Sequence, residues 1–440
     1  MKIHYTFFPP RDPDSLPVKA LHEVLGAESH QLFRELVLET MEIPQITKIK
    51  CVDANPNNIR IVDEDGRLFV IENINSLVDP ESDDHQTILQ RIQQSKQVRQ
   101  HVLKTYPMFD GVNRKVMGLA SYTEHALFIV KDTERNQTVL FGQGTNQYRQ
   151  LCDRSLLTPI VGDEGKHANY PLMVFDPSKE IHNGNESHYT ITHVGCAFSF
   201  SVCVINNIHV HMSGQNWLRE GFEHNWNDTV ITTNCPVKQL VCGNFHVCIL
   251  TQDNRVWTGG SCYDGQCLKD HALIGCNHLA FCSTQAFAGS DNLLLKSVFG
   301  FYHLYGISDF FPATNQYAAF EIERKYGLPV SDETDAIVKP IINPFKLEIQ
   351  DIELNRNYLC YRFKKSSFIV FKGSAYDSTG SVNDLCIDFE KEFGKRPMKY
   401  RTGPNSFIAY DDMSSVSLSY FFTRMLETSN NAQLADVTIQ

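Results

Sequence analysis

The residues best suited to bind a metal ion are cysteines in the second half of the chain. Six of them lie within about forty residues of one another: Cys242, Cys248, Cys262, Cys267, Cys276 and Cys282. Structural zinc sites usually begin with two cysteines separated by two residues, and no pair in this sequence has that spacing. Cys242 and Cys248 lie in a segment typical of β-strands, where small thiols are often buried. We therefore predict that these cysteines pack in the core, and we expect no metal and no cofactor.

Histidines offer the next possible chemistry. His209 and His211 lie two residues apart, so they would share one face of a strand. Three more lie close by in the sequence: His182, His188 and His193. No further ligand stands at a recognised spacing from the pair, which favours a structural role. His125 and His246 occupy equivalent places in two repeats, and this repetition favours hydrogen bonding between strands over catalysis at one of them.

Sequence motifs of common enzymes are absent. The chain has no Gly-x-x-x-x-Gly-Lys-Ser/Thr phosphate loop, no Gly-x-Ser-x-Gly turn and no His-Glu-x-x-His helix. An active site assembled from separate repeats would leave no such motif, so the absence lowers the expectation of an enzyme without removing it. We expect a protein that is not an enzyme.

Aromatic residues point to protein binding instead. Two of the three tryptophans lie within eleven residues, together with an arginine and a phenylalanine, after the strand-ending glycine Gly214. Tryptophan and arginine are the usual anchors of protein interfaces. The alternative is that these rings pack against the adjoining repeat. With a second, weaker pair of aromatic residues, the candidate partner-binding residues are Trp217, Arg219, Phe222, Trp226, Phe310 and Phe311.

These residues must be positioned by repeated β-hairpins. In the clearest one, residues 247–251 and 255–258 predict two strands joined by the turn pair Asp253-Asn254, and Gly259-Gly260 ends the second strand. One hairpin is not stable alone, so it must be repeated or covered. We identify seven hairpins, at a mean spacing of about 58 residues. Their second strands are predicted to end near residues 72, 144, 214, 260, 300, 373 and 420.

The segment Val241–Gln266 carries a recognisable pattern: Cys-Gly-x-x-His, an apolar strand, a turn, and Val-aromatic-x-x-Gly. It resembles the regulator of chromosome condensation family, although Gly259 and Cys262 stand where that family has Trp and Asn. The segment Asn146–Cys152 retains part of the same pattern. The resemblance implies an all-β, seven-bladed β-propeller, whereas the dipeptides of WD repeats are absent and only one glycine pair would suit a Kelch propeller.

The domain organisation follows from the segments between hairpins. Apolar residues recur at helical spacing between Ser15 and Met41, so residues 1–45 are predicted to form a helical segment packed on or beside the propeller. Residues 46–440 would form the propeller, with helical or loop insertions at about 81–118, 154–190 and 309–346. A final strand near residues 417–422 is expected to close the ring against N-terminal sequence, since an open ring would leave unpaired edges.

Composition limits the partners. A formal net charge of −11 argues against binding to the nucleic-acid backbone. No apolar run is long enough to span a membrane, and the first residues do not resemble a secretory signal, so we expect a cytoplasmic or nuclear protein. The expected function is a non-catalytic scaffold or adaptor that binds other proteins, within a larger complex. The alternative, implied by the founding member of the resembled family, is guanine-nucleotide exchange on a Ran-like small GTPase.

Overall fold

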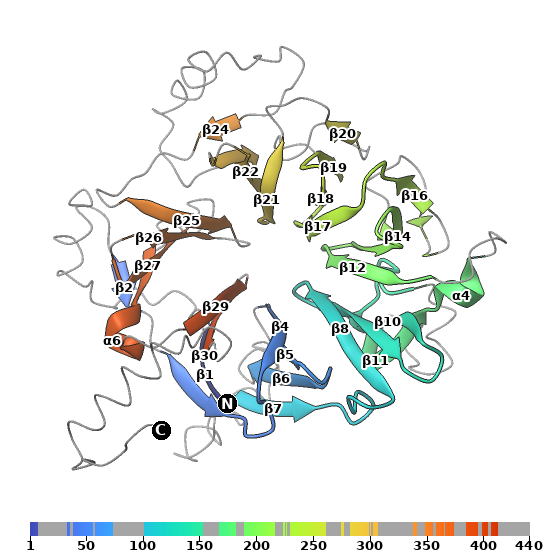
Figure 1. Cartoon of the computed structure of the whole chain (residues 1–440), viewed down its shortest axis with the longest axis horizontal. Coiled ribbons are helices and arrows are strands. Elements are labelled where there is room, and N and C mark those ends of the chain that lie inside the picture. The colour runs from blue at the N-terminus through green and yellow to red at the C-terminus, as the bar shows by residue number, and fades with distance from the viewer. Residues whose placement is uncertain are drawn as a thin grey trace, which may run out of the picture.

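The computed structural model shows a ring of seven β-sheets, and the first strands of the sheets surround the centre of the ring (Figure 1). The structure describes these residues: 1–7, 33–35, 38–55, 58–73, 101–152, 167–181, 189–215, 223–224, 226, 229–260, 274–276, 282–298, 300, 302–306, 338–340, 348–354, 358–364, 366–373, 384–394, 398–403 and 406–411. Each sheet is one blade of a β-propeller, which confirms the predicted fold class.

Blades 1 to 4 follow one another along the chain, each from its innermost to its outermost strand. Blade 1 contains β4 (Ile49–Ala54), β5 (Asn58–Asp63), β6 (Leu68–Asn73) and β7 (His101–Thr105). Blade 2 contains β8 (Arg114–Ser121), β9 (His125–Asp132), β10 (Gln137–Thr145) and β11 (His167–Phe175). Blade 3 contains β12 (Ile191–Cys196), β13 (Phe200–Ile205), β14 (His209–Gln215), β15 (Glu223–His224) and β16 (Thr229–Thr232). Blade 4 contains β17 (Val237–Cys242), β18 (His246–Thr251), β19 (Val256–Gly260) and β20 (Ile274–Cys276).

Blades 5 to 7 complete the ring. Blade 5 contains β21 (Ser283–Ala288), β22 (Asn292–Ser297), β23 (Tyr302–Gly306) and β24 (Val338–Pro340). Blade 6 contains β25 (Ile349–Leu354), β26 (Tyr358–Phe363), β27 (Phe368–Gly373) and β28 (Asp384–Asp388), with β2 (Phe33–Glu35) added in parallel to its outer edge. Blade 7 contains β29 (Met398–Gly403), β30 (Ser406–Asp411), β1 (Lys2–Phe7) and β3 (Glu39–Glu42). The described part of the chain also contains two short helices: α4 (Pro177–Glu180) and α6 (Phe389–Phe393).

The ring closes in blade 7, where strands from both ends of the chain share one sheet. β1 pairs on one edge with β30, with Tyr5 opposite Ile408, and on its other edge with β3. Because β30 already pairs with β29 and β1, it has no edge left for a strand at residues 417–422. Closure by N-terminal sequence is therefore confirmed, but the C-terminal strand that closes the ring lies earlier in the chain than predicted. Residues 412–440 lie outside the described part of the chain.

The N-terminal segment differs from its prediction. Residues 2–7, 33–35 and 39–42 are strands of blades 6 and 7, so the prediction of a helical segment beside the propeller is wrong for these residues. Ile3, buried in the core around Ile59 and Ile408, shows why. Apolar side chains at the ends of the segment fill the space between blades 7 and 1, and the blade decides their conformation. The other residues of 1–32 with helical spacing lie outside the described residues.

The insertions are shorter than predicted. The segment 81–118 contains β7 and the start of β8, the segment 154–190 contains β11 and α4, and the segment 309–346 contains β24. These strands form outer edges and neighbouring inner strands of the blades. Their patterns are weaker in the sequence because an outer strand is buried less completely than a central one, as the burial pattern of β11 shows.

The second strand of the fifth predicted hairpin ends later in the chain than expected. Its second hairpin strand ends at Gly306, which pairs with Asn292, whereas the sequence had suggested an end near residue 300. Gly306 matches Gly144, Gly214 and Gly260 at the same place in blades 2 to 4, and all four have a positive φ of 98° to 122°. Gly300 lies in the turn between β22 and β23.

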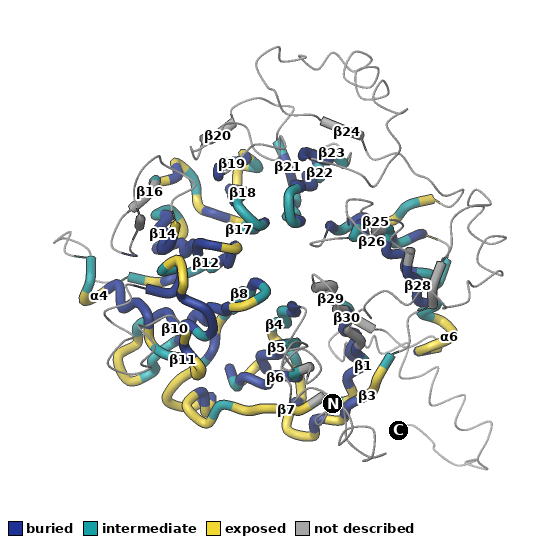
Figure 2. The backbone as a smooth tube through the Cα atoms, turned by 180° about the vertical axis from the view of Figure 1, so that it is seen from behind, coloured by how far each residue is buried: buried dark blue, intermediate teal, exposed yellow. Residues whose placement is uncertain are grey.

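Apolar side chains fill the spaces between blades. Phe109, Phe128 and Phe141 form one such cluster between blades 1 and 2, with ring centroids 5.4–6.0 Å apart in the two pairs made by Phe109. Burial is highest along the middle strands of the blades, while the connections are mostly exposed (Figure 2). No helix in the described part of the chain is long and apolar enough to span a membrane.

Candidate protein-interaction site

One face of the propeller carries the connections between the first and second strands of the blades, and we call it the loop face. In blades 1 to 5 this connection has three residues: 55–57, 122–124, 197–199, 243–245 and 289–291. The first residue of each loop donates its amide hydrogen bond to the residue that begins the second strand, over 2.8–2.9 Å. Blades 1 to 5 therefore present the same short loop towards the centre of this face.

In blades 2 to 5, a glycine at the end of the third strand holds the loop close to that strand. At Gly260, φ is +122°, and a Cβ atom would lie 2.1 Å from the carbonyl oxygen of Phe245. At Gly306, φ is +98° and the carbonyl oxygen of Asp291 would lie 2.2 Å away. Only a residue without a side chain allows this approach of two backbones. The loop and the end of the third strand are consequently held as one unit.

The loops also bond to one another across blades. The amide of Phe198 donates to the carbonyl of Asn244 over 2.9 Å, and the amide of Asn244 donates to the carbonyl of Ser290 over 2.8 Å. In blade 1, the Asn55 side chain donates from Nδ2 to the carbonyl oxygen of Tyr122 over 2.8 Å. These bonds join blades 3, 4 and 5, and separately blades 1 and 2, at the loop face.

Four aromatic side chains meet on this framework, and we call them the aromatic cluster: Tyr122, Tyr148, Phe198 and Phe245. The ring centroid of Phe198 lies 6.2 Å from that of Tyr122, 5.6 Å from that of Tyr148 and 5.5 Å from that of Phe245. Phe198 is 38% exposed and Tyr148 is 37% exposed, whereas Tyr122 is buried. The Tyr122 hydroxyl donates a hydrogen bond to Oδ1 of Asn244. Large apolar rings are thus held rigidly at the surface.

Buried polar groups lie behind the cluster. Nε2 of His125 and the hydroxyl of Ser201 in the next blade share a 2.9 Å hydrogen bond, so the predicted bonding between strands is present at His125. Burial lowers the pKa of His125 to about 3 and that of His246 to about 4, so both rings are neutral at neutral pH. The Asp53 carboxylate accepts a hydrogen bond from Ser121 of blade 2, and burial raises its pKa to about 6. His125 and Asp53 therefore connect neighbouring blades.

Three residues that the sequence offered as possible metal ligands, Cys242, Cys248 and His211, are buried or half-buried within the blades. Cys248 is buried and Cys242 is half-buried, and burial raises the pKa of Cys242 to about 12. His211 is buried, with Nδ1 2.8 Å from the carbonyl oxygen of Trp226. Within the part of the chain that the structure describes, no group of three His, Cys, Asp or Glu side chains is arranged as metal ligands.

Trp226 is the only predicted partner-binding residue among the described ones, and it is 2% exposed. Its Nε1 donates to the carbonyl oxygen of Leu151 over 2.5 Å, and its ring stacks on Phe175 at 5.8 Å. For Trp226 the structure supports the alternative of packing against the adjoining blade. The prediction of an exposed anchor is wrong for this residue, because its ring fills the space between blades 2 and 3. Trp217, Arg219, Phe222, Phe310 and Phe311 lie outside the described residues.

β14, the strand that precedes residues 216–222, ends beside the aromatic cluster. Gln215 donates its amide hydrogen bond to the carbonyl of Ser199, which directly follows Phe198. Gln215 also pairs with Glu223, so the segment starts and ends at the loop face of blade 3.

Sequence reasoning missed the aromatic cluster itself. Its members come from three first-to-second strand loops and one loop after a third strand, and they are separated by up to about 120 residues. One signal was available. Phe198 and Phe245 stand two residues and one residue before the second strands of adjacent repeats, so each of these short loops carries one aromatic residue, although at different positions.

The ring of seven sheets, each of four or five strands, defines a β-propeller, and blade 4 carries the pattern of one repeat class. The family model of the regulator of chromosome condensation (RCC1) repeat matches residues 237–266, which include β17, β18 and β19. The chain is an RCC1-like seven-bladed β-propeller. No curated protein matches the sequence.

Solved structures show the same fold. Human WBSCR16 is 11% identical, with a TM-score of 0.56, covering 94% of this chain and 100% of that one. Prp20p from Saccharomyces cerevisiae is 13% identical, with a TM-score of 0.51, covering 87% of this chain and 86% of that one. Its crystal structure is described together with its binding to Gsp1p and histones, and another structure shows yeast RCC1 (Prp20) bound to Kap60. At this identity the similarity concerns the fold.

Proposed function

We propose that the protein is a non-catalytic interaction scaffold that binds another protein through the loop face. The aromatic cluster is the observation that carries this proposal. Phe198 and Tyr148 are each more than a third exposed, although apolar rings are usually buried. Because hydrogen bonds between loops hold them in place, a partner would lose little entropy on the propeller's side when it binds.

The anchors predicted from the sequence are part of the same proposal because of the connections to which they belong. Trp217, Arg219 and Phe222 belong to the connection that begins beside Phe198, and Phe310 and Phe311 belong to the connection after the third strand of blade 5. We include these five residues in the proposed binding surface and leave out Trp226. The proposed location is the cytoplasm or the nucleus, within a larger complex.

Guanine-nucleotide exchange on a Ran-like small GTPase is a second candidate. It is supported by the fold shared with Prp20p, whose crystal structure is described with binding to Gsp1p. The fold alone does not supply an exchange mechanism, since one propeller fold serves many functions. The scaffold proposal rests on a feature of this chain, the aromatic cluster, and is therefore preferred.

A matched set of variants tests the scaffold proposal. Proteins that co-purify with the native chain would be identified by mass spectrometry, and the affinity of the purified partner would then be measured. We expect the double variant Tyr148→Ala/Phe198→Ala to bind about thirtyfold more weakly, since an aromatic hot spot contributes about 2 kcal/mol. Tyr170→Ala is the control, because Tyr170 is 70% exposed but lies on β11 at the rim of blade 2.

The outcomes separate the two candidates. Equal losses in the double variant and in Tyr170→Ala would contradict binding through the loop face. Faster release of labelled GDP from a Ran-type GTPase, at catalytic amounts of the protein, would establish exchange instead. We expect no acceleration above the intrinsic rate.

A further inference from the structure

Each of the first six blades has a β-bulge near the beginning of its innermost strand. In each bulge one residue of the first strand is skipped in the pairing with the second strand. In blade 7 the first strand pairs without a shift, and Lys399 stands at the matching place, second in its strand. We call these residues the bulge ring: Lys50, Met117, Thr192, Lys238, Thr284, Gln350 and Lys399.

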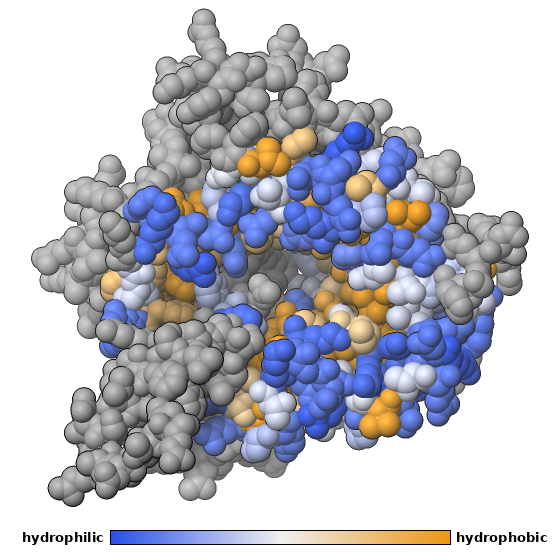
Figure 3. All heavy atoms as spheres, in the orientation of Figure 1, coloured by the Kyte–Doolittle hydropathy of each residue, from blue (hydrophilic) through white to orange (hydrophobic). Residues whose placement is uncertain are grey.

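The bulge ring lies on the side of the propeller opposite the loop face. Each first strand ends at the loop face, where its connection to the second strand begins, so its bulge lies towards the other side. We call that side, which carries the turns between second and third strands, the turn face. The first strands surround the centre of the propeller (Figure 1), and Figure 3 shows a face that is hollowed at this centre. Because a bulge redirects a side chain, the bulge ring can present its side chains around the turn-face end of the centre.

Members of the bulge ring contact one another across blades. Nζ of Lys50 in blade 1 lies 3.4 Å from Sδ of Met117 in blade 2. Nζ of Lys238 in blade 4 donates to the carbonyl oxygen of Thr284 in blade 5 over 3.0 Å and to Oδ1 of Asn254 over 3.4 Å. Both lysine side chains are exposed, and each extends around the ring to the next blade.

These two ammonium groups have only neutral partners. A thioether, an amide oxygen and a carbonyl oxygen do not neutralise a positive charge, and neither Lys50 nor Lys238 makes an ion pair with a residue that the structure describes. Lys399 adds a third exposed ammonium group at the same place in blade 7. No member of the bulge ring is an aspartate or a glutamate. The bulge ring therefore carries positive charge that its own residues leave uncompensated.

Carboxylates close to the bulge ring along the chain are engaged by other groups. Oδ1 of Asp351, which follows Gln350, lies 3.1 Å from Nζ of Lys296. Glu348 forms an ion pair with Lys364. Two further carboxylates of the first strands lie nearer the loop-face ends of their strands: Asp53 and Glu353.

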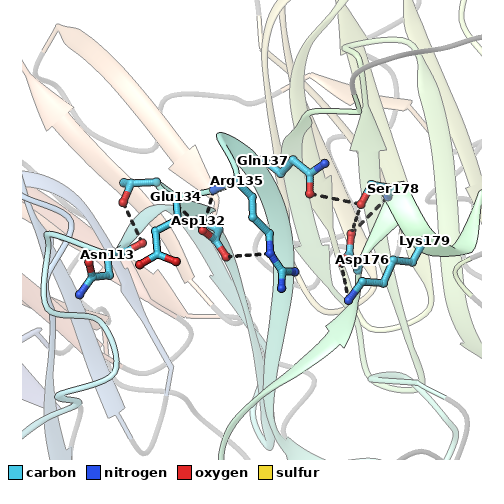
Figure 4. A network of polar contacts seen from close by, with 9 residues as sticks. Asn113, Asp132, Glu134, Arg135, Gln137, Asp176, Ser178 and Lys179 are labelled. Carbon is cyan, nitrogen blue, oxygen red and sulfur yellow. Dashed lines mark hydrogen bonds and ion pairs between the residues drawn. The ribbon is translucent and has the colours of Figure 1, made fainter.

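Charges in the outer connections of the turn face are balanced locally. Figure 4 shows two such ion pairs, Asp132 with Arg135 and Asp176 with Lys179. Glu134, beside the first pair, is exposed and adds negative charge. An anion that approaches the turn face is consequently attracted to the bulge ring and not to these outer connections.

We propose that the bulge ring binds a compact polyphosphate anion at the turn-face end of the centre. Its lysines belong to blades 7, 1 and 4, so a ligand that meets all three must occupy the centre and carry negative charge on more than one side. Phosphate groups have this property, and a lysine ammonium is a common ligand of phosphate. The amide of Gln350 adds a hydrogen-bond donor. The site lies on the opposite face from the aromatic cluster, so this inference goes beyond the proposed scaffold function.

Inorganic tripolyphosphate is the probe that tests this site. Its binding to the full-length protein would be measured by isothermal titration calorimetry at low salt, beside a hexaglutamate peptide. We expect tripolyphosphate to bind about tenfold more tightly than the peptide, with an affinity that falls as salt is raised. Absence of tripolyphosphate binding would overturn the proposal. Equal or tighter binding of hexaglutamate would also overturn it, in favour of an acidic peptide as the ligand.

Charge-removing variants locate the site. Lys50→Gln and Lys238→Gln should each weaken tripolyphosphate binding about three- to tenfold, and the double variant more than either. Lys50→Arg, which retains the charge, should bind about as well as the parent. Since both lysines are exposed, we expect the melting temperature without ligand to stay unchanged in all these variants.

Lys2→Gln is the matched control. Lys2 is exposed and lies on β1, the third strand of blade 7, two strands outward from the first strand that carries Lys399. This variant removes the same charge away from the centre, and we expect unchanged tripolyphosphate binding. Equal losses in Lys2→Gln and Lys50→Gln would overturn the proposal, because they would show an effect of net charge alone.

The aromatic variant separates this site from the loop face. Tyr148→Ala/Phe198→Ala should bind tripolyphosphate like the parent, because both aromatic residues lie on the other face. A loss in this variant as large as in Lys50→Gln would overturn the assignment to the bulge ring. Binding of a partner protein through the loop face does not depend on the outcome, so the two proposals fail separately.

Discussion

Tyr122 and Asn244 are 122 residues apart in the sequence and belong to blades 2 and 4, yet the Tyr122 hydroxyl donates a hydrogen bond to the Asn244 side chain. The bond reaches past the loop of blade 3, which carries Phe198. It therefore ties three adjacent loops together around the most exposed ring of the cluster.

Replacing this tyrosine should loosen the cluster. We expect Tyr122→Phe to lower the free energy of unfolding by about 1 kcal/mol, since one partly buried hydrogen bond is lost and the Asn244 amide is left without that donor. Chemical denaturation would measure the change. Tyr148→Phe is the control, because no hydrogen bond of the Tyr148 hydroxyl occurs among the described residues, and it should change stability by less than about 0.5 kcal/mol.

A comparison of Gly260 with Gly300 separates two reasons why a position requires glycine: a positive φ and a steric clash of the Cβ atom. Both have a positive φ, but a Cβ atom on Gly260 would meet the carbonyl oxygen of Phe245 at 2.1 Å, while nothing lies within 4 Å of one on Gly300. Gly300→Ala should cost about 1 kcal/mol through backbone strain alone, and Gly260→Ala about 1–3 kcal/mol more through the clash. Equal losses on denaturation would show that the close approach of the two backbones is unimportant.

Trp226 should behave as a core residue. We expect Trp226→Ala to lower the free energy of unfolding by about 3–5 kcal/mol, because it leaves a cavity between blades 2 and 3 and removes the bond to Leu151. Trp217→Ala, by contrast, should leave the unfolding transition in place and weaken partner binding. A Trp226→Ala protein as stable as its parent, with lost binding, would restore Trp226 to the interface.

His246 should make the fold sensitive to acid. Its pKa is lowered to about 4 by burial, whereas the unfolded chain binds this proton near pH 6.5, so protonation favours unfolding as the pH falls between these values. From pH 7 to pH 5 this histidine should account for about 2 kcal/mol of lost stability. His246→Gln should therefore show a shallower dependence of unfolding free energy on pH than the parent.

The pH dependence of the parent protein also contains a contribution from Asp53. Asp53 has a raised pKa, about 6, and so acts in the opposite sense by favouring the folded state at low pH. The comparison between variant and parent, and not the total slope, is consequently the measurement. His167→Gln is the control, since His167 is exposed on β11, and a slope altered equally by both variants would contradict the assignment.

The strand that closes the ring, β1, should be required for the stability of the whole propeller. Deletion of residues 1–7 removes the strand between β30 and β3 and exposes two unpaired edges in blade 7. We expect a large loss of thermal stability, or a protein that aggregates, as monitored by circular dichroism and light scattering. A truncated chain with the melting temperature of its parent would contradict closure through β1.

Local sequence determined the hairpins at the centre of the blades. β18 and β19 follow from a run of β-branched residues, a turn pair that accepts a left-handed backbone and a strand-ending glycine, all within fifteen residues. The same signals located β9, β10, β13 and β14, because the middle strands of a blade are buried on both faces and need apolar side chains throughout.

Only the tertiary structure decided the ends of the blades and the site. The sequence around β1 and β3 predicts a helical segment. In the fold these residues form strands, because blade 7 offers sheet edges whose backbone groups form hydrogen bonds with them. Six first strands have a register shift in which one residue is skipped, such as Lys50 and Lys238, and such a bulge is defined only by the pairing with the second strand. The aromatic cluster likewise exists only once three blades stand side by side, since Tyr122, Phe198 and Phe245 have no contact that short stretches of sequence could reveal.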